Sequence, residues 1–354
     1  MKIGWRGVLG ILLSAGFLYF AFRGIELDEV MTHMRTTNVW LMVLAAALAT
    51  GTFPLRAIRW RPILDPVVPD IPYGKLWRAT AIGMMINNVV PARVGEIARA
   101  FALTRSTPAL PFPAALASLV VDRLLDAVVL FGLMFAAMLA PAFPQGAEIS
   151  GRPVSSYAIY GLGFTVVVIA ALYAFILFPA RVLAIWDALS RRMSPKIAAK
   201  GRDALISLSR GLSVLRAPRR FAVVLWWTLA HWLLNAFAFW VGFRAAGMDL
   251  PFSAALFLQG IIAVGVAVPQ APGFFGVFEH FARIGLVGIY GVPADAAVSW
   301  AIAYHLMSYV PITLIGAWYF LRAGISMGEI SGAQRSATGP GVEPGAPASV
   351  APGP

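Results

Sequence analysis

The sequence predicts an all-α protein that crosses a membrane several times, with about six full spans and two re-entrant helical hairpins. Apolar residues make up 59% of its 354 residues and charged residues only 12%, whereas an average soluble domain is roughly 25% charged. A soluble core cannot enclose this much apolar chain without exposing large patches. The apolar residues also form long runs bounded by charges, as in a polytopic membrane protein.

Six apolar segments are close to or above the roughly 20 residues that a spanning helix needs. They are Gly7–Phe22, Val39–Leu55, Ala127–Ala147, Pro153–Ala180, Phe221–Phe243 and Ala296–Leu321. We expect the third to begin earlier, near Phe112. The first segment lacks a small-residue cleavage site before Arg23, so it is expected to be a retained helix rather than a signal peptide.

Two further apolar regions are interrupted and predict hairpins instead of spans. The segment Ala79–Ala92 ends at Pro91 and is followed by a short helical stretch, Gly95–Leu103. The segment Leu250–Phe278 is broken in its middle by Val268–Gly273, which contains two prolines and a glycine. Non-helical backbone at membrane depth is tolerated only where protein buries it or where it lines a wet cavity. Each region is therefore predicted to enter the membrane and return.

The hairpins belong to a weak internal repeat with halves at about residues 39–140 and 221–322. Asp70-Ile71-Pro72-Tyr73 resembles Asp249-Leu250-Pro251-Phe252, and each is followed by a proline break, a glycine, a glutamate and a span with polar residues. With cytoplasmic termini, most of the chain's 28 Lys and Arg residues fall on the inner side. This orientation puts the hairpins on opposite sides of the cell (inner or plasma) membrane, and so predicts an inverted repeat.

Two segments outside the halves carry their own predictions. Residues 181–220 show apolar residues at helical spacing with Arg and Lys on the other faces, which indicates interfacial helices on anionic lipid. A solvated connector packed on the bundle is the alternative. Residues 331–354 are rich in Gly, Pro and Ala and are predicted to form a disordered tail.

The first hairpin contains the most informative motif. Its candidate site residues are Asn87, Asn88, Pro91, Arg93, Gly95 and Glu96. A broken helix frees backbone groups, and the positive N-terminus of its second half suits a phosphate or carboxylate. We expect Arg93 to hold an anionic head group, and Glu96 to neutralise it or exchange protons. In the alternative, Glu96 caps its helix and the asparagines satisfy the turn.

The second hairpin and the two polar spans supply the other candidates. They are Pro269, Pro272, Gly273, Gly276 and Glu279 in the hairpin, and Asp122, Arg123, Asp126 and His305 in the spans. Glu279 is expected either to act in gating or proton exchange or simply to cap its helix. Asp122, Arg123 and Asp126 share a helix face, so mutual pairing is expected, with a substrate contact equally open.

Other polar and aromatic residues favour structural roles. His231 and Asn235 are four residues apart on one span and are expected to bond across helices. The tryptophans, such as Trp226, Trp232 and Trp240, are expected to be belt or packing residues.

Composition and motifs also exclude functions. The chain has no cysteine, which excludes disulfides and thiol chemistry. It shows no phosphate loop, zinc-protease motif, nucleophile elbow or dinucleotide fingerprint. The basic residues that give the net charge of +12 lie between apolar runs. There they are expected to set the topology and to contact anionic lipid rather than to bind nucleic acid. We therefore expect no catalytic residues, cofactor, metal or nucleic-acid partner.

The motifs Asn-Asn-x-x-Pro-x-Arg-x-Gly-Glu at 87–96, Asp-Arg-x-x-Asp at 122–126 and Pro-x-x-Pro-Gly-x-x-Gly-x-x-Glu at 269–279 resemble a known family. They are similar to the flippase-like transmembrane domain of lysylphosphatidylglycerol synthases, as a stand-alone member without the aminoacyltransferase domain. The resemblance implies movement of a modified phospholipid between leaflets. His305 stands where this family often has arginine, which weakens a basic substrate contact there.

Together these observations favour a membrane protein that binds and translocates an amphipathic, anionic or modified lipid. A membrane-embedded lipid-modifying enzyme is the alternative, acting through Glu96, Asp122 or Glu279. A third possibility is a non-catalytic partner of a lipid-synthesis enzyme that uses the basic loop 181–220. A homo-oligomer is compatible with each of these.

Overall fold

A computed structural model describes residues 5–90, 94–144, 146, 148–149, 152–192, 194–195, 198–199, 201–202, 205–206, 216–267 and 272–338. Within these residues the chain is almost entirely helical, as predicted. The described strands are β1 (Glu148–Ile149) and β2 (Arg152–Pro153), which pair antiparallel in a short hairpin.

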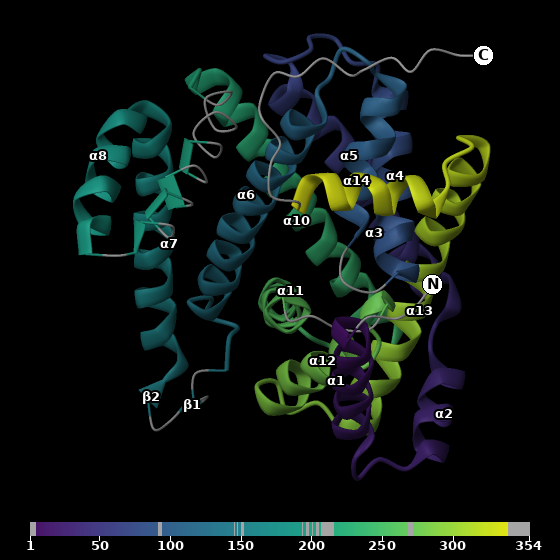
Figure 1. Ribbon diagram of the computed structural model, residues 1–354. Coiled ribbons are helices and arrows are strands. Elements are labelled where there is room, and N and C mark those ends of the chain that lie inside the picture. Colours follow the sequence, from purple (N-terminus) through teal and green to yellow (C-terminus); the bar gives the residue numbers. More distant parts are fainter. Residues whose placement is uncertain are drawn as a thin grey trace.

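The helices follow one another along the chain as shown in Figure 1. They are α1 (Trp5–Phe22), α2 (Leu27–Thr36), α3 (Val39–Leu64), α4 (Tyr73–Val89), α5 (Gly95–Ser106), α6 (Phe112–Met138), α7 (Val154–Leu177), α8 (Pro179–Leu189), η1 (Ser190–Arg192), α10 (Pro218–Ala245), α11 (Phe252–Ala267), η2 (Pro272–Phe274), α12 (Val277–Gly288), α13 (Ala294–Arg322) and α14 (Met327–Thr338).

Two groups of four helices repeat the same order: a long helix, a hairpin of two shorter helices, and a second long helix. The first group is α3, α4, α5 and α6, and the second is α10, α11, α12 and α13. Their contacts also correspond. The two leading helices, α3 and α10, pack together, while α13 packs on α4 and α6 packs on α11. Each group's closing helix thus contacts the other group's hairpin as well as its own.

Four helices among the described residues are long and apolar enough to cross a membrane. These segments are Val39–Leu64, Ile159–Leu177, Pro218–Ala245 and Ala294–Arg322. Helix α6 is long as well, but it carries charged residues in its first half. In α1, the described apolar part is limited to Leu12–Phe22.

Several predicted boundaries were wrong. Helix α3 continues past Leu55 to Leu64, because the arginines taken as its end are buried against carboxylates. Helix α6 does begin at Phe112 but ends at Met138, shortly before Pro141. Helix α14 begins at Met327, where Ser326 and Glu329 cap it, and it runs to Thr338, into the segment predicted to be disordered.

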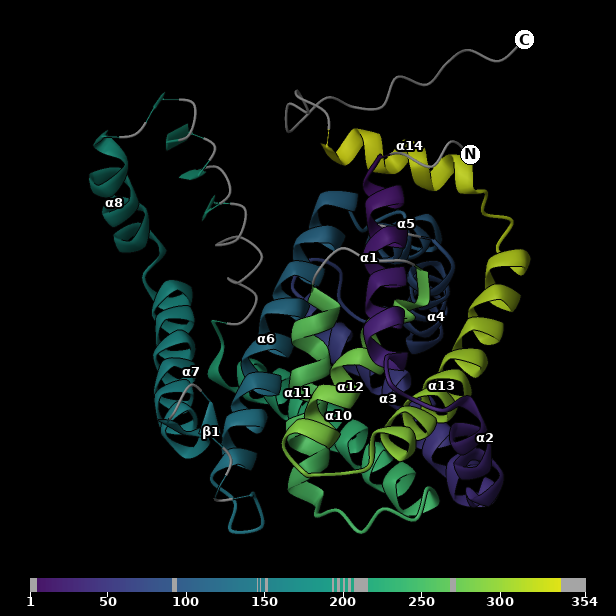
Figure 2. The same cartoon turned by 90° about the horizontal axis from the view of Figure 1, so that it is seen from below.

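Peripheral helices surround this bundle. Helix α1 packs on α12, α2 on α13, and α7 on α6. Figures 1 and 2 show α7 and α8 at one side of the bundle, with α14 lying across its end. No residue described in α8 is buried, and most of residues 193–215 lies outside the described part.

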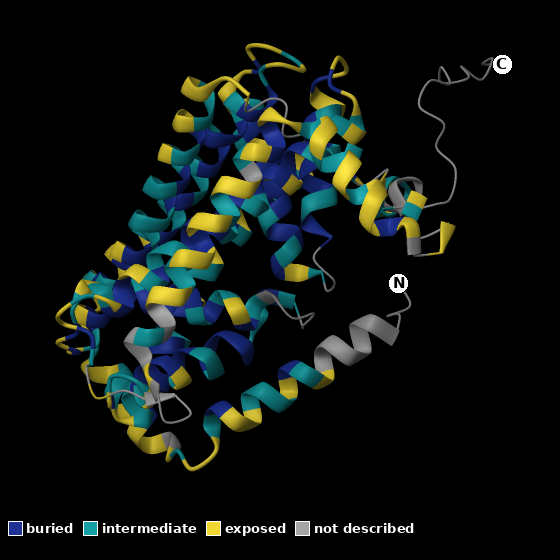
Figure 3. Ribbon diagram, turned by 90° about the vertical axis from the view of Figure 1, so that its left-hand side faces the viewer, coloured by how far each residue is buried: buried dark blue, intermediate teal, exposed yellow. Residues whose placement is uncertain are grey.

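Buried apolar side chains form one large cluster in each half of the bundle. The first surrounds Trp60 and gathers α3, α4, α5 and α6, and the second surrounds Trp300 and gathers α10 to α13. In Figure 3 the buried positions run through the middle of the bundle, and the exposed positions lie on its outer faces. Many exposed positions are large and apolar, such as Leu314 and Phe164, which fits a surface that faces lipid.

Candidate functional site

The two hairpins meet at a cavity of about 260 Å³ in the centre of the bundle. The tip of α4 supplies Asn88 and Met84, and the turn of the second hairpin supplies Gly273 and Phe274. The rest of its wall comes from α3, α10, α11, α12 and α13. It includes Thr52, Phe53, Arg56, His231, Trp232, Asn235, Gln259, Ile262, Val266, Tyr304, His305, Ser308 and Tyr309.

The tip of the first hairpin is held by its asparagines. The side-chain oxygen of Asn87 accepts a hydrogen bond from the backbone N–H of Gly95 at 2.8 Å. A Cβ at Gly95 would lie 2.1 Å from the carbonyl oxygen of Gly83, so only glycine permits this close approach. The predicted turn role of Asn87 is thus confirmed.

Asn88 ties the same tip to α13. Its Nδ2 donates to Oγ1 of Thr313 at 2.7 Å, and its backbone carbonyl accepts from the hydroxyl of Tyr309 at 3.2 Å. Pro91 and Arg93, which follow it in the predicted motif, lie outside the described residues. The predicted role of Arg93 therefore stays a prediction.

Behind the cavity lies a buried network of arginines and aspartates. Arg59 is fully buried, and its guanidinium bridges Asp122 and Asp126 at 2.5 Å each. Arg99 binds Asp122 from the other side at 3.2 Å, and its guanidinium lies over the ring of Trp60 at 4.1 Å. Such charges are tolerated at this depth because each has an opposite partner.

Arg123 and Glu96 extend the network outward. Arg123 contacts Asp126 at 3.3 Å, which confirms the predicted pairing on that helix face. It also contacts Glu96 across the α5–α6 interface at 3.0 Å. The partner predicted for Glu96 was Arg93, but within the described residues its ion pair is with Arg123.

The network carries more positive than negative charge, and Arg56 connects it to the cavity. Four arginines face three carboxylates: Arg56, Arg59, Arg99 and Arg123 against Glu96, Asp122 and Asp126. Arg56 has the longest of these ion pairs, 3.4 Å to Asp126, and its Nε has no hydrogen-bond partner among the described atoms. Asp126 is already shared with Arg59 and with the indole N–H of Trp232. Arg56 is therefore a cation in the cavity wall with donor capacity to spare.

The second hairpin contributes a different pair. Glu279 is buried at the start of α12, where its Oε2 accepts from the N–H of Gly276 at 2.6 Å. Its Oε1 lies 2.7 Å from Nδ1 of His305, which lines the cavity. The predicted cap is confirmed, and the same carboxylate also positions a histidine. The rings of Phe275 and Phe278 lie 4.6 and 4.5 Å from that histidine.

Glycines shape the turn before Glu279. Gly273 and Gly276 have φ values of 71° and 85°, and Phe274 between them is also left-handed at 63°. A Cβ at Gly276 would lie 2.4 Å from the carbonyl oxygen of Ser14, so α1 packs directly on this turn. Pro272 begins η2, and Pro269 lies outside the described residues.

Sequence reasoning missed the basic half of the network and one tryptophan. In the sequence, Arg56 and Arg59 follow the apolar run of a predicted span and indicate only its cytoplasmic end, and no pattern predicts a role for Arg99. The sequence did contain a signal for this network. Arg56 and Arg59 are three residues apart and so share one face of a helix, and the two aspartates, four residues apart, share a face of another. Trp232 was expected only to pack, but it donates to Asp126 at 3.0 Å. His231 and Asn235 bond to α3 and α11, as predicted.

Helical hairpins whose tips line one cavity, within a bundle of membrane-length helices, define a multi-pass membrane protein. Residues 7–316 match the family described as the lysylphosphatidylglycerol synthase TM region, so the chain belongs to that family.

Two relatives illustrate the breadth of the family. The glycosyltransferase AglD of Haloferax volcanii is 26% identical over 333 residues, which cover 87% of this chain. The matched region is only 53% of AglD, so the chain spans about half the length of that relative. A UPF0104 membrane protein of Methanothermobacter thermautotrophicus is 28% identical over 318 residues, covering 85% of this chain and 88% of that protein.

Proposed function

We propose that the protein binds an amphipathic lipid with an anionic or modified head group in the central cavity and moves it between leaflets. The observation that carries the proposal is Arg56, the arginine of the described network that lines the cavity between the two hairpin tips. An anionic group would complete its coordination and balance the network's excess charge. Apolar wall residues such as Phe53, Ile262 and Val266 are suited to the lipid's carbon chain.

Access from both leaflets would follow from an inverted repeat with six spans, in which α1 and α6 join the four membrane-length helices. The matched contacts of α13 with α4 and of α6 with α11 support this arrangement. In it, the hairpins enter from opposite sides, and the two termini are cytoplasmic, in agreement with the distribution of Lys and Arg. The chain has no native cysteine, so single cysteines at Asn88 and Gln270 would report the topology. Impermeant thiol reagents should label the two cysteines from opposite sides of the membrane, and labelling of both from one side would contradict the repeat.

Gating would come from the Glu279–His305 pair. The contact of 2.7 Å joins the half-helix of the second hairpin to α13 beside the cavity. A proton added to or removed from this pair would change the charge that a bound head group meets. The pair is therefore the proposed coupling site, and the arginine network is the proposed fixed anchor.

Lipid retained by the purified protein tests the binding part of the proposal. Native mass spectrometry in mild detergent would compare the wild type, Arg56→Gln and the control Arg35→Gln, which removes an exposed charge on α2. We expect a defined lipid on the wild type and the control and its loss from Arg56→Gln. The same lipid bound equally to all three would refute a head-group role for Arg56.

A membrane-embedded transferase is the second candidate, because AglD bears the name glycosyltransferase. It predicts a chemically changed lipid. Incubation of the reconstituted protein with its retained lipid and nucleotide-sugar donors, followed by lipid mass spectrometry, distinguishes the two. A product of altered mass would favour the transferase, and unchanged lipid would favour translocation.

A further inference from the structure

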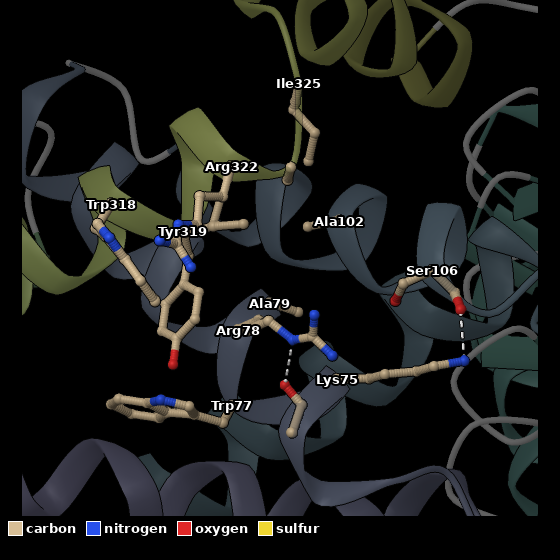
Figure 4. Close-up of a pocket in the computed structure, with 13 residues that line it drawn as sticks. Lys75, Trp77, Arg78, Ala79, Ala102, Ser106, Trp318, Tyr319, Arg322 and Ile325 are labelled. Carbon is tan, nitrogen blue, oxygen red and sulfur yellow. Dashed lines mark hydrogen bonds between the residues drawn. The ribbon is translucent and has the colours of Figure 1, made fainter.

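A second cavity, of about 380 Å³, opens at the end of the bundle where α4 begins and α13 ends (Figure 4). It shares no lining residue with the central cavity. Its walls come from the first turns of α4, the last turns of α13 and the end of α5. The site is therefore separate from the one assigned above.

Three cations surround this cavity: Lys75, Arg78 and Arg322. Lys75 donates to the backbone carbonyl of Ser106 at 2.6 Å, and Arg78 Nε donates to the carbonyl of Gly74 at 2.9 Å. Arg322 lies over the ring of Trp318 at 4.1 Å. In the described part of the chain, none of the three forms an ion pair with a carboxylate. Their side chains are thus positioned by neutral groups, and their charges remain available to an anion.

An arginine near this cavity does have a carboxylate partner. Arg105, at the end of α5, binds the carboxylate of Glu329 on α14. The carboxylate of Glu329 is therefore engaged with Arg105. The positive charge of the second cavity is not balanced by that helix.

The cation cavity continues into an apolar hollow on the outer face of the bundle. This hollow, of about 490 Å³, is lined by Trp77, Leu314, Ile315, Trp318 and Tyr319. Three of these, Trp77, Trp318 and Tyr319, also line the cation cavity, so the two spaces share one aromatic wall. Leu314 is 64% exposed. A ligand that fills both spaces must be anionic at one end and apolar at the other.

We propose that this surface binds an anionic phospholipid, with its phosphate between Lys75, Arg78 and Arg322 and an acyl chain along Trp77 and Leu314. Aromatic residues beside basic ones are typical of the membrane interface, where head group and chain separate. A soluble phosphate would use the cations but not the hollow. The hollow is thus the reason to assign a lipid.

The bound lipid would bridge α4 and α13. Helix α4 belongs to the first hairpin, and α13 is the last helix of the second group. These helices pack closely, since a Cβ at Gly316 would lie 2.3 Å from the carbonyl oxygen of Ala81. The lipid is therefore a structural lipid that holds the first hairpin against α13. It remains in place while the central cavity exchanges its own ligand.

Binding of short-chain lipids to the purified full-length protein tests this assignment. The probes are dioctanoyl phosphatidylglycerol, dioctanoyl phosphatidylcholine and glycerol 1-phosphate, with affinity measured by microscale thermophoresis. Arg78→Gln/Arg322→Gln should weaken binding of the phosphatidylglycerol at least ~10-fold, since each charge-assisted contact contributes about 1.5–3 kcal/mol. The matched control Arg35→Gln/Arg219→Gln, which removes two exposed charges elsewhere, should leave it unchanged.

Further binding measurements distinguish a lipid from other ligands, and the second cavity from the central one. Leu314→Ser should weaken binding of phosphatidylglycerol but not of glycerol phosphate, and phosphatidylcholine should bind weakly to all forms. Equal affinity for glycerol phosphate and phosphatidylglycerol would assign the site to a soluble anion and overturn the proposal. Unchanged phosphatidylglycerol binding in the double variant would also overturn it. The loss caused by Arg78→Gln/Arg322→Gln should be the same when the two substitutions are made in an Arg56→Gln background, so the second cavity is tested apart from the central one.

Discussion

The two hairpins have the same backbone plan and opposite chemistry. The α4–α5 hairpin packs against a network of arginines and aspartates, in which Arg59 holds two carboxylates at 2.5 Å. The α11–α12 hairpin has one buried carboxylate, Glu279, and its partner is a histidine. Arginine stays protonated at any physiological pH, whereas histidine is the side chain that changes charge near neutrality. The first half thus holds a network of several charges, and the second a single carboxylate–histidine pair.

This difference suggests a division of labour around the central cavity. Arg56 and His305 line the same space from opposite halves. A fixed cation can hold an anionic head group, but it cannot release it without a change elsewhere. The titratable pair provides that change in our account. The following predictions test whether the halves differ in this way.

The largest effect is expected from breaking the fixed half. Arg59→Met leaves Asp122 and Asp126 without their central partner, and breaking a buried ion pair costs about 3–5 kcal/mol. Thermal unfolding followed by fluorescence-detected size exclusion should show severe loss of folded protein. The control Arg61→Met breaks exposed pairs with Asp65 and Asp70 and should cost less than about 1 kcal/mol. Similar melting of the two variants would contradict the buried network as a structural anchor.

A smaller effect is expected at the turn glycines, where the halves should behave alike. Gly95→Ala and Gly276→Ala each place a methyl group against a backbone carbonyl, at 2.1 and 2.4 Å. Each should destabilise the protein by about 1–3 kcal/mol in the same melting assay. Gly288→Ala is the control, because a Cβ there meets no atom within 4 Å. A neutral result at only one hairpin would show that the two tips are not equivalent in packing.

Neutralising the second hairpin should barely change stability. In Glu279→Gln, the amide oxygen can still accept from Gly276 and the amide nitrogen can donate to His305, so the loss should stay below about 1.5 kcal/mol. Lipid translocation, in contrast, should lose its dependence on pH between 5 and 8. Fluorescent-lipid translocation in proteoliposomes would measure this. A variant that keeps the wild-type pH profile would remove Glu279 from the coupling role.

The smallest effect is expected at the exposed contact between α14 and α5. The N–H and hydroxyl groups of Ser326 and the guanidinium of Arg105 hold the pKa of Glu329 below its ordinary value of 4.5. The contact is therefore fully present above that value and is lost as pH falls through the lowered pKa. Hydrogen exchange should show α14 opening as the pH falls below 4.5 and through the lowered pKa of Glu329, while α5 stays protected. Opening of both together would mean that α14 supports the first hairpin.

The fold could be predicted from sequence further than the site could. Hydropathy and helix breakers predict both hairpins, because Pro91 and the Val268–Gly273 segment interrupt apolar runs. They did not predict α2, whose polar residues are mostly exposed, nor the extension of α3 to Leu64, because arginines buried in ion pairs look like loop residues in a sequence. Asp122 and Asp126 could be predicted because charged residues inside an apolar run stand out in a sequence. Arg59 could not, because a charged residue at the end of an apolar run looks like an ordinary helix boundary.

Partners across helices were the least predictable feature. His305 and Glu279 are 26 residues apart, and Arg56 and Asp126 are 70 apart. No local spacing encodes such pairs, because they arise from how α3, α6, α12 and α13 pack. The turn role of Asn87 was predictable because its partner, Gly95, lies within the same hairpin.

The most direct test of a fixed anchor and a titratable gate at one cavity is lipid translocation measured in proteoliposomes. The wild type, Arg56→Gln, Glu279→Gln and Arg35→Gln would be assayed with the lipid that co-purifies with the wild type, at several pH values. We predict that Arg56→Gln abolishes translocation at every pH, that Glu279→Gln alters only its pH dependence, and that Arg35→Gln matches the wild type. Translocation by Arg56→Gln at the wild-type rate would contradict the account.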